Sequence, residues 1–270
     1  MALPALLFQD ISAVDIRESW NGGFVLFCFI ATFLSITGVT VLSFFVVKRE
    51  ERGEFVQGAY RSSAAILGIA FIQNIYGTSG MAPLMIIGTV PLYNAFAVIV
   101  LSLLKPGQRK MDKALLQKTL KGIVTNPIIL GIAAGFVWAI LKIPQPEILQ
   151  KTVKNMAVLA TPLGLMAMGA SFEGKKALGK LKPTLIASAL KLVVLAAIFL
   201  PIAVWLGYRE SELVAILVML GSATTVSSFV MARNMGHEGV LTSSIVMVTT
   251  LCSAFTLTGW LFLLKTLGLV

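Results

Sequence analysis

Long stretches without a charged side chain constrain this sequence more than any other feature. Residues 24–47, 122–141, 155–172, 213–232 and 239–264 contain no Asp, Glu, Lys or Arg. Each is close to the ~20 residues that an α-helix needs to cross the hydrocarbon core of a bilayer. The chain is 57% hydrophobic and 13% charged, whereas about a quarter of the residues of a soluble domain are charged. These runs predict an all-α polytopic membrane protein.

Two longer segments complete a set of eight predicted spans. Residues 62–104 are free of charge but about twice too long for one span, and the Gly77–Gly80 turn divides them. Residues 183–207 are apolar apart from Lys191. The predicted helices are 22–47, 56–76, 80–104, 122–141, 150–172, 183–206, 212–234 and 239–264.

Positive charge is distributed over alternating loops instead of forming one patch. The net charge of +10 would suit nucleic-acid binding, but alternation is what the positive-inside rule requires of a membrane protein. The larger set lies at residues 48–52, 105–121, 175–182 and 233, and the smaller set is Arg17, Lys142, Lys151, Lys154, Arg209 and Lys265. We therefore place the larger set in the cytoplasm. We expect a multi-pass protein of the cell membrane, with the lipid bilayer and no nucleic acid as partner.

The sequence has no arrangement typical of an enzyme or a metal site. His237 is the only histidine, and Cys28 and Cys252 both lie inside apolar spans. There is no Gly-Lys-Ser/Thr phosphate loop and no nucleophile or paired-carboxylate motif. We expect no catalytic residue, no cofactor and no metal.

An internal repeat relates the two halves of the chain. The same offset of 159 residues aligns Gly77 with Gly236 and residues 94–96 with residues 253–255. Five-helix repeats in tandem insert with opposite orientation, as in many secondary transporters. We expect inverted repeats at 1–104 and 122–270, joined by a basic cytoplasmic linker at 105–121.

The first repeat is expected to be incomplete. Pro4 aligns with Pro162, so residues 1–10 correspond to the second half of the helix predicted at 150–172. The helix at 122–141 has no counterpart within the chain. We therefore expect a ten-helix fold that lacks about one and a half N-terminal helices.

Small and hydroxyl-bearing residues are concentrated in two of the predicted spans. Small residues allow close approach between helices, and hydroxyls supply hydrogen bonds in a polar cavity. A single hydroxyl is better explained as a contact between helices, but the clusters as a whole favour a binding site. The candidate substrate-binding residues are Ser63, Gln73, Asn74, Ser222, Thr224, Thr225, Ser227 and Ser228.

Two basic residues could attract an anion to that site. Arg61 begins a span, where the alternative is an anchor at the membrane interface. Lys191 lies roughly 12 Å along its helix from Pro183. A charge at that depth is unfavourable unless it is paired or faces water. Asn94 is also deep in a span, where we expect a structural hydrogen bond.

Several stretches together resemble the auxin efflux carrier family. They are Ala2-Leu-Pro-Ala-Leu-Leu-Phe8, Arg61-Ser-Ser-Ala-Ala-Ile-Leu-Gly-Ile-Ala70, Tyr76-Gly77, Ala160-Thr-Pro-Leu-Gly-Leu165, Gly169-Ala-Ser-Phe172 and Phe229-Val-Met-Ala-Arg233. The resemblance implies ten helices, with a scaffold of helices 1, 2, 6 and 7 and a mobile half of the other six. It also implies that helices 4 and 9, here 56–76 and 212–234, are broken and cross near the binding site.

The sequence departs from the family pattern where those breaks are expected. The family breaks these helices at proline, whereas this chain has Ala70 and Ala223 at the matching places. Alanine is the best helix former, so a break here would depend on Gly68, Gly221 and the Ser/Thr clusters. We include Gly68, Ala70 and Gly221 in the candidate site. Pro4 and Pro162 are candidates for a helix break or a packing contact.

The function that these patterns favour is secondary active transport of small organic anions by alternating access. The resemblance implies malate, malonate or auxin-like carboxylates as substrates. Candidate partners are a coupling ion, H⁺ or Na⁺, and a second copy of the chain. The alternatives are a sodium-coupled carrier of the bile-acid type and a truncated membrane protein that does not transport.

Overall fold

The computed structural model describes residues 2–12, 21–77, 80–106, 125, 127–141, 144–171 and 173–270, and these contain helices but no strand. The elements are α1 (Ala2–Ser12), α2 (Gly22–Val46), η1 (Arg49–Glu51), α3 (Arg52–Tyr60), α4 (Ala64–Tyr76), α5 (Ala82–Leu103), α7 (Pro127–Leu141), α8 (Glu147–Val158), α9 (Ala160–Ala170), α10 (Gly174–Gly179), α11 (Leu181–Ala189), the π-helical η2 (Leu190–Val194), α12 (Leu195–Trp205), α13 (Glu210–Gly221), α14 (Ser227–Asn234) and α15 (Val240–Thr266).

The predicted all-α membrane architecture is confirmed. Within the described residues, five continuous helical stretches are long and apolar enough to cross a membrane: Gly22–Val46, Ala82–Leu103, Glu147–Ala170, Leu181–Trp205 and Val240–Thr266. The segments predicted at 56–76 and 212–234 are also helical, but each is divided into two shorter helices.

Helix α2 shows how the sequence builds these spans. Asn21 starts it, because the Asn21 side chain accepts a hydrogen bond from the backbone N–H of Phe24 at 3.1 Å. One face buries Phe24, Cys28 and Ile36, while the opposite face exposes large apolar side chains such as Phe45. In water such exposure would be unfavourable, but acyl chains accommodate it.

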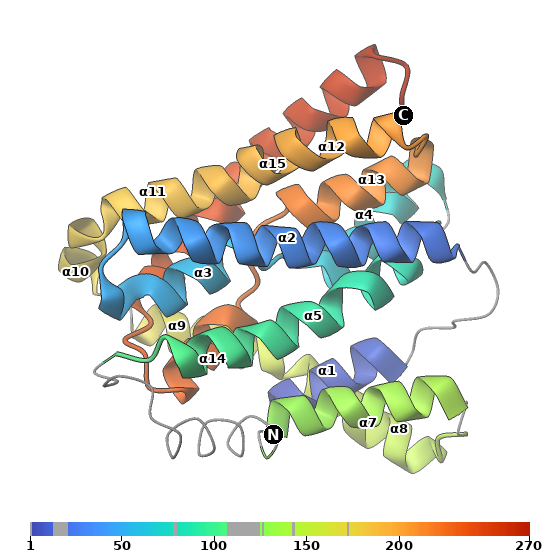
Figure 1. Cartoon of the computed structure of the whole chain (residues 1–270). Helices are drawn as coiled ribbons and strands as arrows, with labels where there is room; N and C mark the ends of the chain where they lie inside the picture. Colours follow the sequence, from blue (N-terminus) through green and yellow to red (C-terminus); the bar gives the residue numbers. More distant parts are fainter. Residues whose placement is uncertain are drawn as a thin grey trace.

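The helices form two groups (Figure 1). Helix α1 packs against α7 and α8, along the lower side of the molecule in the view of Figure 1. The other group has its hydrophobic core among α2, α3, α4, α5, α13, α15 and the α11–α12 rod. Helix α9 continues from α8 and packs against α14 of the larger group. The smaller group is thus attached to the larger one chiefly through α9 and α5.

Two prolines of the predicted repeat lie in the smaller group. Pro4 is inside α1, and its carbonyl oxygen lies only 2.7 Å from where a Cβ would stand on Gly131 of α7. The close approach of α1 and α7 therefore requires glycine at that position. Pro162 lies in the first turn of α9, where a missing N–H is tolerated. Pro4 marks a packing contact, and Pro162 follows the junction of α8 and α9 at Leu159.

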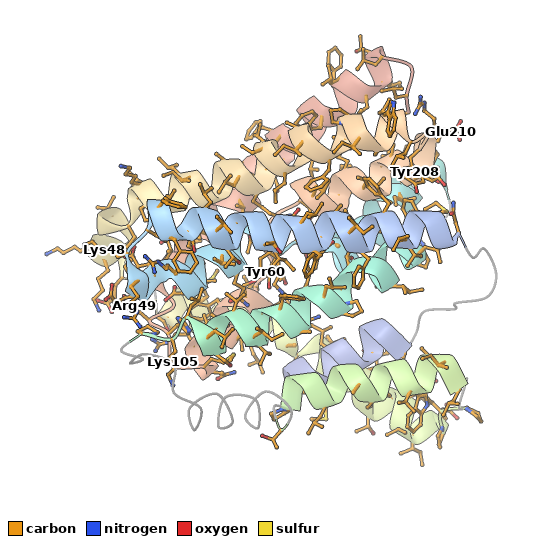
Figure 2. The ribbon with its side chains drawn as sticks, viewed as in Figure 1. Lys48, Arg49, Tyr60, Lys105, Tyr208 and Glu210 are labelled. Carbon is orange, nitrogen blue, oxygen red and sulfur yellow. The ribbon has the colours of Figure 1, made fainter. Side chains whose placement is uncertain are left out.

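Charged loops gather at the two ends of the helices. Figure 2 shows Lys48, Arg49 and Lys105 at one end and Tyr208 and Glu210 at the other. Lys48 and Lys180, which come from different loops, both line a cavity at the first end. The loops that carry Lys48 and Lys180 therefore lie at the same end of the helices, as the positive-inside pattern predicts for them. Tyr60 lies between the two ends (Figure 2).

Candidate functional site

Two interrupted helices form the centre of the larger group. Helix α3 ends at Tyr60, residues 61–63 are not helical, and α4 begins at Ala64. In the second half of the chain, α13 ends at Gly221 and α14 begins at Ser227. Arg61 and Ser222 both have extended backbone, with ψ of 130° and 165°. Each predicted span is therefore two half-helices joined by a short extended segment.

The two interruptions touch each other. The backbone N–H of Ser63 donates to the carbonyl of Ala223 at 3.0 Å. The Thr224 hydroxyl donates to the carbonyl of Gly58 in α3 at 2.7 Å. Because Tyr60 lies midway between the charged ends of the molecule, this contact is near the middle of the helices. We call residues 61–63 and 222–226 the crossing.

The first break is not where the family pattern placed it. Gly68 and Ala70 both lie inside α4, which runs without interruption to Tyr76. Alanine favours the helix there, while Ser62 and Ser63 offer side-chain hydrogen bonds that compete with helical ones. In the second of these spans Ala223 does lie within the break, two residues after Gly221.

Gln73 and Asn74 are not part of the crossing. Both are exposed on the last turns of α4, and Gln73 lies ten positions after Ser63, roughly 15 Å along the helix. The prediction that they reach inward beside Ser63 is wrong, because the break precedes α4 and leaves them near its far end.

The hydroxyls of the second copy divide into partnered and unpartnered ones. Thr224 is fully engaged, since its backbone N–H also donates to Thr249 Oγ1 at 3.1 Å. Thr225 and Ser227 hydrogen-bond each other at 3.2 Å. The hydroxyls of Ser222 and Ser228 are buried and have no hydrogen-bond partner among the residues that the structure describes. An unpartnered buried hydroxyl is unfavourable, so these two are the groups best able to gain a hydrogen bond from a ligand.

Arg61 points into the protein instead of anchoring at a membrane surface. Its side chain is 2% exposed, and its guanidinium donates to Asn94 Oδ1 and contacts Met231 Sδ. Asn94 is held in turn, because its Nδ2 donates to the carbonyl of Val90 at 2.9 Å. This confirms the structural hydrogen bond expected of Asn94 and places a cation inside the first break.

Lys191 reaches the second break from a different helix. It belongs to the π-helical turn η2 and is fully buried. Its Nζ donates to the carbonyl of Leu220 at 2.8 Å and to that of Met219 at 3.3 Å. Both carbonyls belong to the last turn of α13. Among the described residues, neither Lys191 nor Arg61 forms an ion pair with a carboxylate.

Two tyrosines at the crossing were not anticipated. The Tyr93 hydroxyl donates to the carbonyl of Met219 at 2.9 Å, and the Tyr60 hydroxyl donates to the carbonyl of Tyr93 at 3.1 Å. Both side chains are buried. The position of Tyr93, adjacent to Asn94 deep in an apolar span, was a signal that could have identified it.

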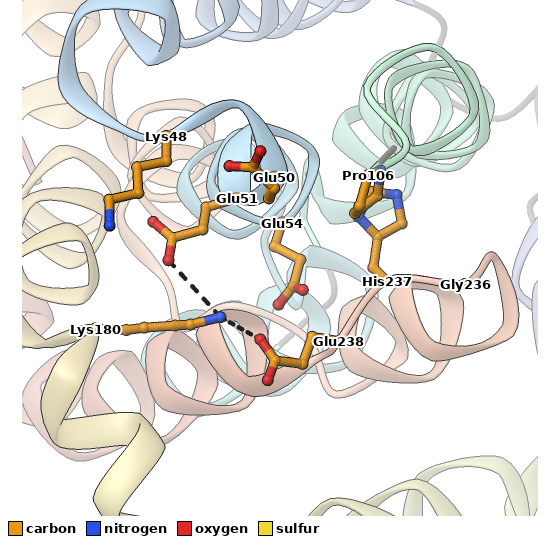
Figure 3. A pocket seen from close by; sticks show the side chains of 9 residues that line it. All are labelled: Lys48, Glu50, Glu51, Glu54, Pro106, Lys180, Gly236, His237 and Glu238. Atoms are coloured by element: carbon orange, nitrogen blue, oxygen red, sulfur yellow. Dashed lines mark hydrogen bonds and ion pairs between the residues drawn. The ribbon is translucent and has the colours of Figure 1, made fainter. Parts of the chain in front are cut away.

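A charged cavity of about 530 Å³ lies at the end of the helices that carries Lys48 (Figure 3). Lys180 extends between Glu51, at 3.7 Å, and Glu238, at 2.5 Å. Hydrogen bonding to Lys180 lowers the pKa of the Glu238 carboxyl. Glu54 accepts from the backbone N–H groups of Gly239 and Thr242, and so caps the start of α15. Four glutamates line this cavity, and Lys180 is already paired with two of them, so the cavity is less suited to an anion than the crossing.

The comparisons with known proteins agree with this architecture. A family model described as "Membrane transport protein" matches residues 1–261. A protein of Rhizobium meliloti (strain 1021), named "Putative malonate transporter", is 26% identical over 276 residues, which cover 98% of this chain and 84% of that protein. The family and this relative's name are those of transporters, not of enzymes. The chain therefore belongs to the membrane transport protein family, the auxin efflux carrier family that its motifs resemble.

Proposed function

We propose that this protein is a secondary active carrier that moves small organic anions, of the malonate and malate class, across the membrane by alternating access. The observation that carries the proposal is the pair of buried cations at the crossing. Arg61 and Lys191 lie at the two breaks, and no described carboxylate pairs with either. The name of the Rhizobium meliloti relative supports malonate as the first substrate to test.

Of the two cations, Arg61 is the one suited to bind a carboxylate. Among the described residues, the guanidinium of Arg61 has only a neutral amide oxygen and a thioether as partners. A buried charge without an opposite charge is unfavourable, and a guanidinium matches the two oxygens of a carboxylate in a bidentate pair. An arriving anion would therefore gain a strong contact and neutralise the site.

Two hydroxyls of the second break, which touches the first at Ser63 and Ala223, suit the same ligand. The hydroxyls of Ser222 and Ser228 are buried and have no partner in the described part of the chain, so each has a hydrogen to donate. Ser228 is also in the first turn of α14, and the start of a helix carries a partial positive charge. The proposed site thus combines one full charge, two hydroxyl donors and one helix terminus.

Alternating access is proposed from the packing of the two helix groups. The group of α1, α7 and α8 corresponds to the scaffold that the family resemblance implies, and the group that contains the crossing corresponds to the mobile half. In the described conformation the Arg61 side chain is 2% exposed, so the anion would have to be admitted by a movement between the groups. The direction of transport is left to experiment.

The test is uptake of radiolabelled malonate into proteoliposomes that contain the purified protein and no ATP. We expect uptake that unlabelled malate and succinate inhibit, because all three carry the same two carboxylates. Arg209, exposed at the other end of the molecule, supplies the control substitution Arg209→Gln, which should transport normally. Absence of uptake for malonate, malate, succinate and an indole carboxylate would refute the proposed function.

A further inference from the structure

We infer that the ammonium group of Lys191 takes the place of a coupling cation at the carboxyl end of α13, so that the carrier works without Na⁺. The inference rests on the proposed function, since it specifies which ion that carrier does not need. The groups that suggest it are two backbone carbonyls that the break in the helix leaves without their usual partners.

The break frees the carbonyls of Met219 and Leu220. In a continued helix they would accept from the N–H groups of Ala223 and Thr224, four residues later. Thr224 N instead donates to Thr249 Oγ1, and the segment that contains Ala223 is extended. The last carbonyls of a helix also carry its partial negative charge. In broken-helix transporters, such carbonyls are typical ligands of Na⁺.

In this chain, side-chain donors already occupy these carbonyls. Lys191 Nζ lies 2.8 Å from the Leu220 oxygen and 3.3 Å from the Met219 oxygen, while the Tyr93 hydroxyl donates to the Met219 oxygen. Lys191 is fully buried, and no described carboxylate pairs with it. The ammonium therefore has the position, the charge and the oxygen ligands of a bound monovalent cation.

The local helix geometry holds Lys191 in this position. The residue lies in the π-helical turn η2, a feature often found at functional sites. The carbonyl of Leu192, in the same turn, accepts from Trp260 Nε1 at 3.1 Å. Gly221 packs against this turn, because a Cβ on Gly221 would lie 3.7 Å from the Leu192 oxygen. The end of α13 and the turn that carries Lys191 are thus in direct contact.

The predicted repeat pairs Lys191 with an uncharged residue. Subtracting the offset of 159 from 191 gives Thr32 on α2, whose hydroxyl lies 3.9 Å from the sulfur of Met219. The equivalent residues approach the same residue of α13, but only one of them is charged. A lysine is therefore not required by the repeat architecture, which favours a specific role at this break.

The experiment measures the thermal stability of the purified protein in NaCl and in choline chloride at equal ionic strength. For the wild-type protein we expect the same melting temperature in both salts. Lys191→Ala removes the ammonium and leaves room for an ion, so we expect a lower melting temperature in choline and a recovery of about 2–4 °C in NaCl. Lys191→Met fills the space with an apolar chain and should be destabilised equally in both salts.

Lys182→Gln, an exposed lysine near the start of α11, is the matched control and should behave like the wild type. The inference is overturned if the wild-type protein melts at a higher temperature in NaCl than in choline chloride. It is also overturned if Lys191→Ala melts at the same temperature in both salts. If Lys191→Ala cannot be purified, malonate uptake by the wild-type protein tests the inference instead. Replacement of Na⁺ by choline should change uptake less than twofold, and a loss of tenfold or more would contradict the inference. Because the melting measurement needs no substrate, it can fail or succeed independently of the proposed function.

Discussion

The two breaks at the crossing have similar backbones but different chemistry. In the first break the cation belongs to the extended segment itself, and Arg61 is held by the side chains of Asn94 and Met231. In the second break the cation comes from another helix, and Lys191 is held by backbone carbonyls. The partners of Arg61 are neutral side chains that a ligand could displace, whereas those of Lys191 are fixed groups of α13. The comparison teaches that two similar backbone interruptions can hold a cation in different ways, one through displaceable side chains and the other through fixed carbonyls.

The largest expected effect comes from removing the charge in the first break. Arg61→Gln keeps a donor to Asn94 but loses the cation, and loss of a charge-assisted hydrogen bond to a carboxylate weakens affinity roughly ten- to a hundredfold. Malonate uptake measured over a range of concentrations should show a correspondingly raised KM. Arg61→Lys should recover part of this loss, because the charge returns without the bidentate geometry. If Arg61→Gln took up malonate as well as the wild type, the proposal that the first break binds the ligand and the second does not would be wrong.

The next effect tests the hydrogen bonds that join the breaks. Thr224→Val removes the donor to the Gly58 carbonyl and should lower the free energy of unfolding by about 1–3 kcal/mol. The readout is chemical denaturation of the purified protein in detergent. Thr37→Val, on the exposed face of α2, is the matched control and should change stability by less than about 0.5 kcal/mol. Equal effects of the two substitutions would mean that the contact between the breaks contributes little.

For the unpartnered hydroxyls we expect a smaller effect, and one on transport instead of on stability. Ser222→Ala and Ser228→Ala remove groups that have no partner among the described residues, so stability should be unchanged within about 0.5 kcal/mol. Each should raise the KM for malonate about tenfold if the hydroxyl donates to the anion. Ser43→Ala removes a buried hydroxyl that has a partner. It should lower the stability and leave the KM for malonate unchanged. A loss of stability without a change in KM would make these hydroxyls structural.

The smallest effect is expected at the end of α4. Gln73→Ala and Asn74→Leu alter exposed side chains distant from both breaks, so uptake of malonate should change less than twofold. A large loss of uptake would show that the substrate path extends along α4, and it would weaken the assignment of binding to the crossing.

The sequence was sufficient to predict the fold because a membrane span can be recognised from its local composition. The charge-free runs located α2, α5 and α15 within a few residues, since each side chain in a span must be compatible with lipid or with buried packing. The crossing of 56–76 and 212–234 was also anticipated, from the clusters of small and hydroxyl residues together with the family resemblance.

The details of the site were harder to predict because they depend on contacts between distant residues. The first break occurs at Arg61–Ser63, not at Ala70, because serine side chains interrupt a helix without leaving the signal that a proline gives. Glu54 caps the start of α15 through the N–H of Gly239, 185 residues later in the chain, and no local sequence pattern indicates such a contact. The direction of Gln73 and Asn74 could not be known before the start of α4 was fixed.

The central claim is that the anion binds at the crossing, and a structure determined with malonate bound tests it most directly. The account predicts malonate density with one carboxylate within hydrogen-bond distance of the Arg61 guanidinium and of the hydroxyl of Ser222 or Ser228. It also predicts that Lys191 Nζ remains on the carbonyls of Met219 and Leu220. Malonate bound only in the charged cavity lined by Lys48, Lys180 and Glu238, with Arg61 still held by Asn94, would contradict the account.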